Sequence, residues 1–176
     1  MKKLFKTLTF FFCILGSGVL ASSMAQNPGL TDPEIASIAV AANQIDIDFA
    51  EIALERSSDE EVLGLARTMA SDHQMVIDRA VELVTRLGVT PQDNAVSQSL
   101  QKDANSTRER LQRLSQEEFD KAYVDNEVAY HEKVIAAVEE LLIPQATNEE
   151  LKALLEEVLP VLKGHLEHAQ MIRKKQ

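Results

Sequence analysis

The chain has 176 residues, a net charge of −10 at neutral pH and a single cysteine. The acidic excess argues against binding to nucleic acids or to anionic membrane surfaces, because both attract basic protein faces. With one cysteine, the chain has neither an internal disulfide framework nor a cysteine-rich metal site.

Residues 1–25 have the pattern of a secretory signal peptide, with a positive start, a short apolar run and small residues before the cleavage site. The apolar run, 8–20, is shorter than the roughly 20 residues that cross a membrane. We therefore expect cleavage before Gln26 and no transmembrane span after processing, with an uncleaved N-terminal anchor as the alternative. Cys13 lies inside the apolar run rather than at the cleavage site, which argues against a lipoprotein.

Residues 26–176 would form one exported domain, located in the periplasm or secreted. Loss of the three leader lysines changes the net charge from −10 to −13. The remaining length is sufficient for a domain with its own hydrophobic core. A protein partner or a homo-oligomer is compatible with this sequence, but no pattern in it identifies one.

Four segments have the apolar spacing of long α-helices, with steps that alternate between three and four residues. The expected helices extend from Thr31 to about Ile52, from Ser58 to Leu87, from Ser115 to about Leu142, and from Thr147 to about Ile172. Capping boxes are expected at Ser58, Ser115 and Thr147, each with Glu three residues later, and Gly88 should end the second helix. Residues 89–115 are polar, and we expect a long connection containing a short helix near 99–114.

This pattern predicts an all-α protein with the topology of a ferritin-like four-helix bundle, in which one long crossover connects the second and third helices. A plain up-down bundle with a decorated loop is the alternative. Pro160 falls inside the last helix and cannot donate to the carbonyl of Glu156, so a kink is expected there. Such a kink either follows the curvature of the core or orients His165.

Three expected helices place a histidine in a position where the spacing requires a core residue: His73, His131 and His165. Asp46 borders the apolar stripe of the first helix, and Glu127 precedes His131 by one helical turn. At 1.5 Å per residue, His73 and His131 both lie roughly 22 Å from the same end of the bundle, and Asp46 lies roughly 16 Å from it. The sequence therefore predicts that these side chains converge at mid-bundle.

Three imidazole nitrogens and one carboxylate oxygen suit Zn²⁺, Fe²⁺ or Cu²⁺. We therefore expect one transition metal ion bound by His73, His131 and His165, with Asp46 or Glu127 as the oxygen donor. The alternative is a polar core layer, in which the histidines hydrogen-bond to nearby carboxylates or tyrosines. The available partners are Asp46, Glu127, Tyr123 and Tyr130.

Enzymatic activity has no positive evidence in the sequence. No histidine has Glu three residues before it, so the paired Glu-x-x-His motifs of di-iron bundles are missing. The HLEH at 165–168 is not the HExxH of zinc proteases, and glycine-rich phosphate loops are absent. The leading hypothesis is an exported metal-binding or stress-related protein. An interaction or structural bundle without metal is second, and a redox enzyme is third.

Several short motifs resemble domain of unknown function family 4142: MASDHQ at 69–74, FDKAYV at 119–124, His131, and LPVLKGHLEHA at 159–169. The resemblance covers about 35–172. It implies an exported bacterial ferritin-like bundle, often labelled a predicted outer membrane protein, with no established activity. The family pattern matches Asp72, His73, Phe119, Asp120, Tyr123, His131, Pro160 and His165. The chain departs from the pattern at Asp46, where a glutamate is expected, and at Tyr130, where an aspartate is common.

Overall fold

The computed structural model describes residues 29–176, so the expected leader lies outside the described residues. The elements are α1 (Asp32–Arg56), α2 (Glu60–Leu87), α3 (Ala95–Arg113), α4 (Gln116–Ala137), the π-helical turn η1 (Val138–Leu142), α5 (Ile143–Gln145) and α6 (Glu149–Arg173). No strand occurs within these residues, and the prediction of an all-α chain is confirmed. No helix in this part of the chain is both long and apolar enough to span a membrane.

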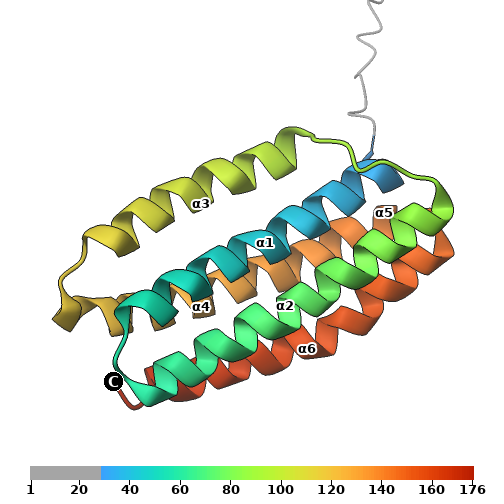
Figure 1. The fold of residues 1–176 in the computed structure, drawn as a ribbon. Helices are drawn as coiled ribbons and strands as arrows, with labels where there is room; N and C mark the ends of the chain where they lie inside the picture. Colours follow the sequence, from blue (N-terminus) through green and yellow to red (C-terminus); the bar gives the residue numbers. More distant parts are fainter. Residues whose placement is uncertain (1–28) are drawn as a thin grey trace, which may run out of the picture.

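Helices α1, α2, α4 and α6 form a bundle, and α3 lies along the outside of α1 (Figure 1). At one end of the bundle, Ser37 near the start of α1 donates to Asp93, which precedes α3. At the other end, Arg56 donates to the carbonyl oxygens of Leu111 and Leu114, at 2.6 Å each. Helix α3 therefore returns the chain along the length of α1, and α2 and α4 run in the same direction.

Two predicted helix caps are wrong by one residue. The N-cap of α2 is Asp59 rather than Ser58, and its carboxylate accepts from the backbone N–H groups of Glu61 and Val62. The N-cap of α6 is Asn148, because Thr147 instead donates to Asp32 at the start of α1. In both cases a side chain with a better-placed acceptor caps the helix.

Other predicted helix ends are confirmed. The Ser115 hydroxyl lies 2.7 Å from the carboxylate of Glu118 in a capping box that begins α4. Helix α2 ends at Gly88, whose φ of 65° is left-handed and favours glycine. Helix α6 continues through Pro160 as a single helix.

The connection between α2 and α4 contains a helix, as the sequence predicts. Helix α3 spans 19 residues, Ala95–Arg113, and begins four residues before the segment expected near 99–114. It buries only three of its residues, Ser97, Ala104 and Leu111. The apolar spacing that identifies an amphipathic helix is therefore weak in this segment. Its start is fixed by Asn94, whose side chain accepts from the N–H groups of Val96 and Ser97.

The bundle core consists of two apolar clusters separated along the bundle axis. One contains Phe49, Leu65, Met69, Phe119 and Tyr123 among its members. The other contains Ile35, Leu83, Leu142, Leu151 and Leu155. On α2, α4 and α6, the histidine falls in the sequence between segments that belong to different clusters, whereas Asp46 and Glu127 lie within segments of the first cluster.

Candidate metal centre

The structure brings all five sequence-predicted site residues together at mid-bundle. Asp46 comes from α1, His73 from α2, Glu127 and His131 from α4, and His165 from α6. Both carboxylate residues are completely buried, and the least buried member, His165, is 6% exposed. Each helix can bury its polar residue because most of its neighbours at three- and four-residue spacing are apolar.

The three imidazole rings face one another across the bundle axis. Their centroids are separated by 5.2 Å for His73 and His165, 5.5 Å for His131 and His165, and 5.6 Å for His73 and His131. One ring nitrogen from each histidine lies within 4.8 Å of the other two. Asp46, Glu127 and His131 form a second, overlapping group with the same limit.

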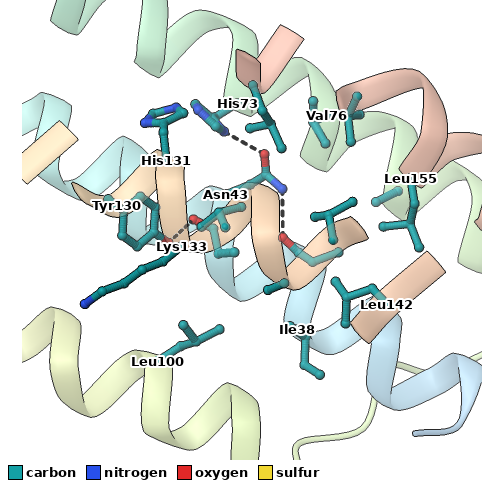
Figure 2. Close-up of a pocket in the computed structure, with 18 of the residues that line it drawn as sticks. Ile38, Asn43, His73, Val76, Leu100, Tyr130, His131, Lys133, Leu142 and Leu155 are labelled. Atoms are coloured by element: carbon teal, nitrogen blue, oxygen red, sulfur yellow. Dashed lines mark hydrogen bonds between the residues drawn. The ribbon is translucent and has the colours of Figure 1, made fainter. Parts of the chain in front are cut away.

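The outward nitrogen of His73 is held by Asn43, which lies on α1 (Figure 2). His73 Nδ1 is 2.7 Å from Asn43 Oδ1, and Asn43 Nδ2 donates to the Ala39 carbonyl at 2.8 Å. Because the amide nitrogen already faces a carbonyl, the amide oxygen must face the histidine. His73 Nδ1 therefore carries the proton and donates to Asn43.

The other two histidines are held in the same way. His131 Nδ1 lies 3.0 Å from the main-chain oxygen of Glu127, and His165 Nε2 lies 3.0 Å from Oδ2 of Asp72. Both partners are acceptors, so each of these nitrogens is an N–H donor. The remaining nitrogens, Nε2 of His73, Nε2 of His131 and Nδ1 of His165, are buried without a hydrogen-bond partner among residues 29–176.

Asp46 places a carboxylate against these inward nitrogens. Its Oδ2 is 2.5 Å from Nε2 of His73 and 3.6 Å from Nε2 of His131. Despite the short distances, no hydrogen bond of good geometry reaches either oxygen of Asp46 from the described residues. The lone pair of a neutral His73 would repel the carboxylate, so this arrangement requires a positive charge between the two groups, either a second proton on His73 or a cation.

The two carboxylates of the centre differ in how readily they ionise. Burial raises the pKa of Asp46, but the close contacts of this carboxylate with His73, His131 and Glu127 outweigh burial and lower that pKa to about 2. Burial and the adjacent charge of Asp46 raise the pKa of Glu127 well above its usual range. Asp46 therefore loses its proton more readily than a free carboxyl group, and Glu127 less readily.

His131 and His165 are neutral near pH 7. Burial lowers the pKa of His131, and the charges of His73 and His165 lower it further against the opposing effect of Asp46. Burial also lowers the pKa of His165, against the opposing effect of the hydrogen bond that His165 donates to Asp72. A neutral imidazole has a free nitrogen lone pair, which is the form that binds a metal ion.

Sequence reasoning missed the roles of two residues. In the sequence, Asn43 is only a neighbour of Asp46 on the first helix, but in the structure it bonds to His73. Asp72 is adjacent to His73 in the sequence but contacts His165 instead. The tyrosines expected as alternative partners do not bond to the histidines, since Tyr130 donates to the carbonyl of Ala42 and the Tyr123 hydroxyl has no partner in the described part of the chain.

Residues 19–172 match the family described as Domain of unknown function (DUF4142), and the chain belongs to this family. No curated protein matches the chain. Two solved structures are similar at 16% sequence identity, which shows the fold alone. The structure of CopM in the Cu(II)-bound form covers 83% of this chain and 98% of its own, with a TM-score of 0.63. A DUF305 fragment from Deinococcus radiodurans covers 85% and 100%, with a TM-score of 0.70.

Proposed function

We propose that this protein is an exported metal-binding protein that holds one transition metal ion at mid-bundle. His73, His131 and His165 supply three nitrogen ligands, Asp46 supplies an oxygen ligand, and Glu127 is a further oxygen donor beside it. We also propose that the bundle is ferritin-like, with α3 as a helical crossover. The common direction of α2 and α4, with α3 returning the chain between them, supports this topology.

The observation that carries the proposal is the orientation of the three histidines. In each ring, one nitrogen donates to an acceptor in the surrounding shell and the other faces the centre, where that of His73 lies 2.5 Å from Oδ2 of Asp46. Outer-shell acceptors of this kind fix the tautomer of metal-binding histidines. The inward histidine nitrogens and the ionised Asp46 are hydrogen-bond acceptors, and the centre has too few hydrogen-bond donors to pair with them.

A polar core layer is the competing interpretation, and the hydrogen bonding argues against it. Buried polar groups that only fix helix register are normally paired with each other. Here, both oxygens of Asp46 and of Glu127 and all three inward nitrogens are without partners of good geometry among residues 29–176. Burial of unpaired polar atoms destabilises the fold, whereas a bound cation would satisfy them.

Copper is the first ion to test. Among the divalent first-row ions, Cu²⁺ binds a given set of nitrogen and oxygen ligands most tightly. The similar structure of CopM is described as Cu(II)-bound, which supports the same choice. Zn²⁺ and Fe²⁺ also accept histidine and carboxylate ligands and are the next candidates.

We assign the centre to binding of the ion, such as storage or protection under metal stress, and propose no reaction. The bound ion would supply the positive charge that Asp46 and the inward lone pairs require. The surrounding apolar clusters seal the ligand atoms from solvent, which favours retention of an ion.

The proposal is tested with untagged protein and a competing chelator of known Cu²⁺ affinity. Replacement of His73, His131 or His165 with Ala should each weaken binding by at least tenfold. His168→Ala is the matched control, because this fourth histidine is partly buried on α6 and belongs to neither ligand group. Equal affinity in all four variants, or no binding of Cu²⁺, Zn²⁺ or Fe²⁺ by the parent protein, would favour the polar core layer.

A further inference from the structure

A cavity of about 180 Å³ lies beside His73 and His131, and Figure 2 shows residues of its wall. All four bundle helices and α3 contribute to its wall. The wall is mainly aliphatic, and its large apolar members include Ile38, Val76, Leu100, Leu142 and Leu155. His73 and His131 form part of the wall nearest the metal centre.

The cavity exists because small side chains occupy positions where larger side chains of neighbouring helices would otherwise pack against one another. Ala36, Ala39 and Ala42 line it from α1, and Ala137 lines it from α4. An alanine in such a position leaves the volume of three or more carbon atoms unfilled, which costs stability in a close-packed core. A bound molecule that fills the space would restore the missing contacts.

The polar groups on the wall offer little to a charged ligand. Asn43 bonds to His73 and to the Ala39 carbonyl, and the Tyr130 hydroxyl donates to Ala42. Asn126 Nδ2 is buried without a partner among the described residues, but an amide is uncharged. The two charged residues of the wall, Asp103 and Lys133, have opposite signs and are exposed. The interior therefore has no unpaired charge that would compensate for the loss of hydration of an ionised ligand.

We propose that this cavity binds a compact, uncharged, apolar molecule of about the size of a single aromatic ring. An apolar protein cavity of roughly 150 Å³ stays dry and binds benzene, so the volume found here is sufficient. Pockets between the helices of a bundle are common sites for such ligands. This inference does not depend on a metal ion at the centre.

Titration of the full protein with benzene and toluene, followed by methyl NMR, tests the proposal. Saturable shifts of the Ile38, Val76, Leu142 and Leu155 methyl signals are expected, with benzoate binding at least tenfold more weakly. The absence of saturable shifts up to the solubility limit, or benzoate binding as tightly as benzene, would overturn the proposal.

Two neighbouring alanines provide a matched pair of variants. Ala137 lines the cavity, whereas Ala136 has the same intermediate exposure on α4 and does not line it. Ala137→Leu should weaken benzene binding at least tenfold, and Ala136→Leu should leave it unchanged. If Ala137→Leu does not fold, Ala39→Leu fills the same cavity from α1. Undiminished binding in the folded cavity-filling variant would place the ligand elsewhere and overturn the assignment.

Discussion

The Asp72 carboxylate on α2 accepts a hydrogen bond from Nε2 of His165 on α6, at 3.0 Å. This contact turns Nδ1 of His165 toward the centre, where it is buried without a partner in the described part of the chain. Asp72 is itself 31% exposed at its side chain, so it connects the sealed centre to the protein surface. The orientation of His165, a proposed ligand, therefore depends on a residue that is not itself a proposed ligand.

Asp72→Ala should weaken metal binding by about 10- to 100-fold, which is the usual cost of losing an outer-shell partner of a histidine ligand. The ligands remain present, so binding should be impaired rather than abolished. Competition titrations with Cu²⁺ measure the effect, and Asp78→Ala on the same helix is the control, because Asp78 is exposed and its carboxylate accepts a hydrogen bond from Gln74. Unchanged affinity in Asp72→Ala would mean that this hydrogen bond does not position His165.

Glu127→Gln should change how the stability of the metal-free protein depends on pH. The pKa of Glu127 is raised in the fold, so its contribution to stability is present below the unfolded pKa, near 4.5, and is lost as the pH rises. Glutamine has no proton to lose. The stability of Glu127→Gln relative to the parent should therefore increase above pH 4.5, by on the order of 1 kcal/mol per pH unit.

Urea unfolding in the presence of a chelator, at several pH values between 4.5 and 7.5, measures this difference. Glu132→Gln provides the control, because Glu132 is an exposed glutamate on the same helix. A constant difference between Glu127→Gln and the parent over this range would show that Glu127 has an ordinary pKa in the folded protein.

Arg56→Ala should destabilise the junction between α3 and α4 by roughly 2–3 kcal/mol. Its guanidinium donates to the carbonyls of Leu111 and Leu114 and lies 4.7 Å from the centroid of the Phe119 ring. Hydrogen bonds from charged donors and a cation–π contact each contribute about 1 kcal/mol or more. Thermal and urea unfolding measure the loss.

Arg67→Ala is the comparison for Arg56→Ala. Arg67 is 59% exposed at its side chain and is 3.8 Å from Glu60, an ion pair worth less than about 1 kcal/mol. Equal stability losses for the two variants would contradict the role assigned to Arg56.

The sequence was sufficient to predict the long helices and the convergence of the site residues. The alternation of three- and four-residue steps identified the four bundle helices, because amphipathic helices must bury one face. The rise per residue then placed His73 and His131 at one level, as the structure shows. Helix α3 was expected near 99–114, but its start at Ala95 was missed, because the helix buries few residues and so shows little apolar periodicity.

The hydrogen bonds around the histidines could not be predicted from spacing alone. Asp72 and His73 are adjacent in the sequence but point about 100° apart on the helix, so they contact different neighbours. Whether Asp72 reaches α6 and His73 reaches α1 depends on the arrangement of the helices in space. The partners of His73 and His165, Asn43 and Asp72, became apparent only from the structure.

The central claim is that the inward nitrogens of three histidines bind one metal ion. Electron paramagnetic resonance of the protein with one equivalent of Cu²⁺ tests this directly, because the nitrogen couplings count the bound imidazole rings. We predict three imidazoles in the parent and in His168→Ala, and two in each of His73→Ala, His131→Ala and His165→Ala. A spectrum that stays the same when all three of these histidines are replaced would contradict the claim.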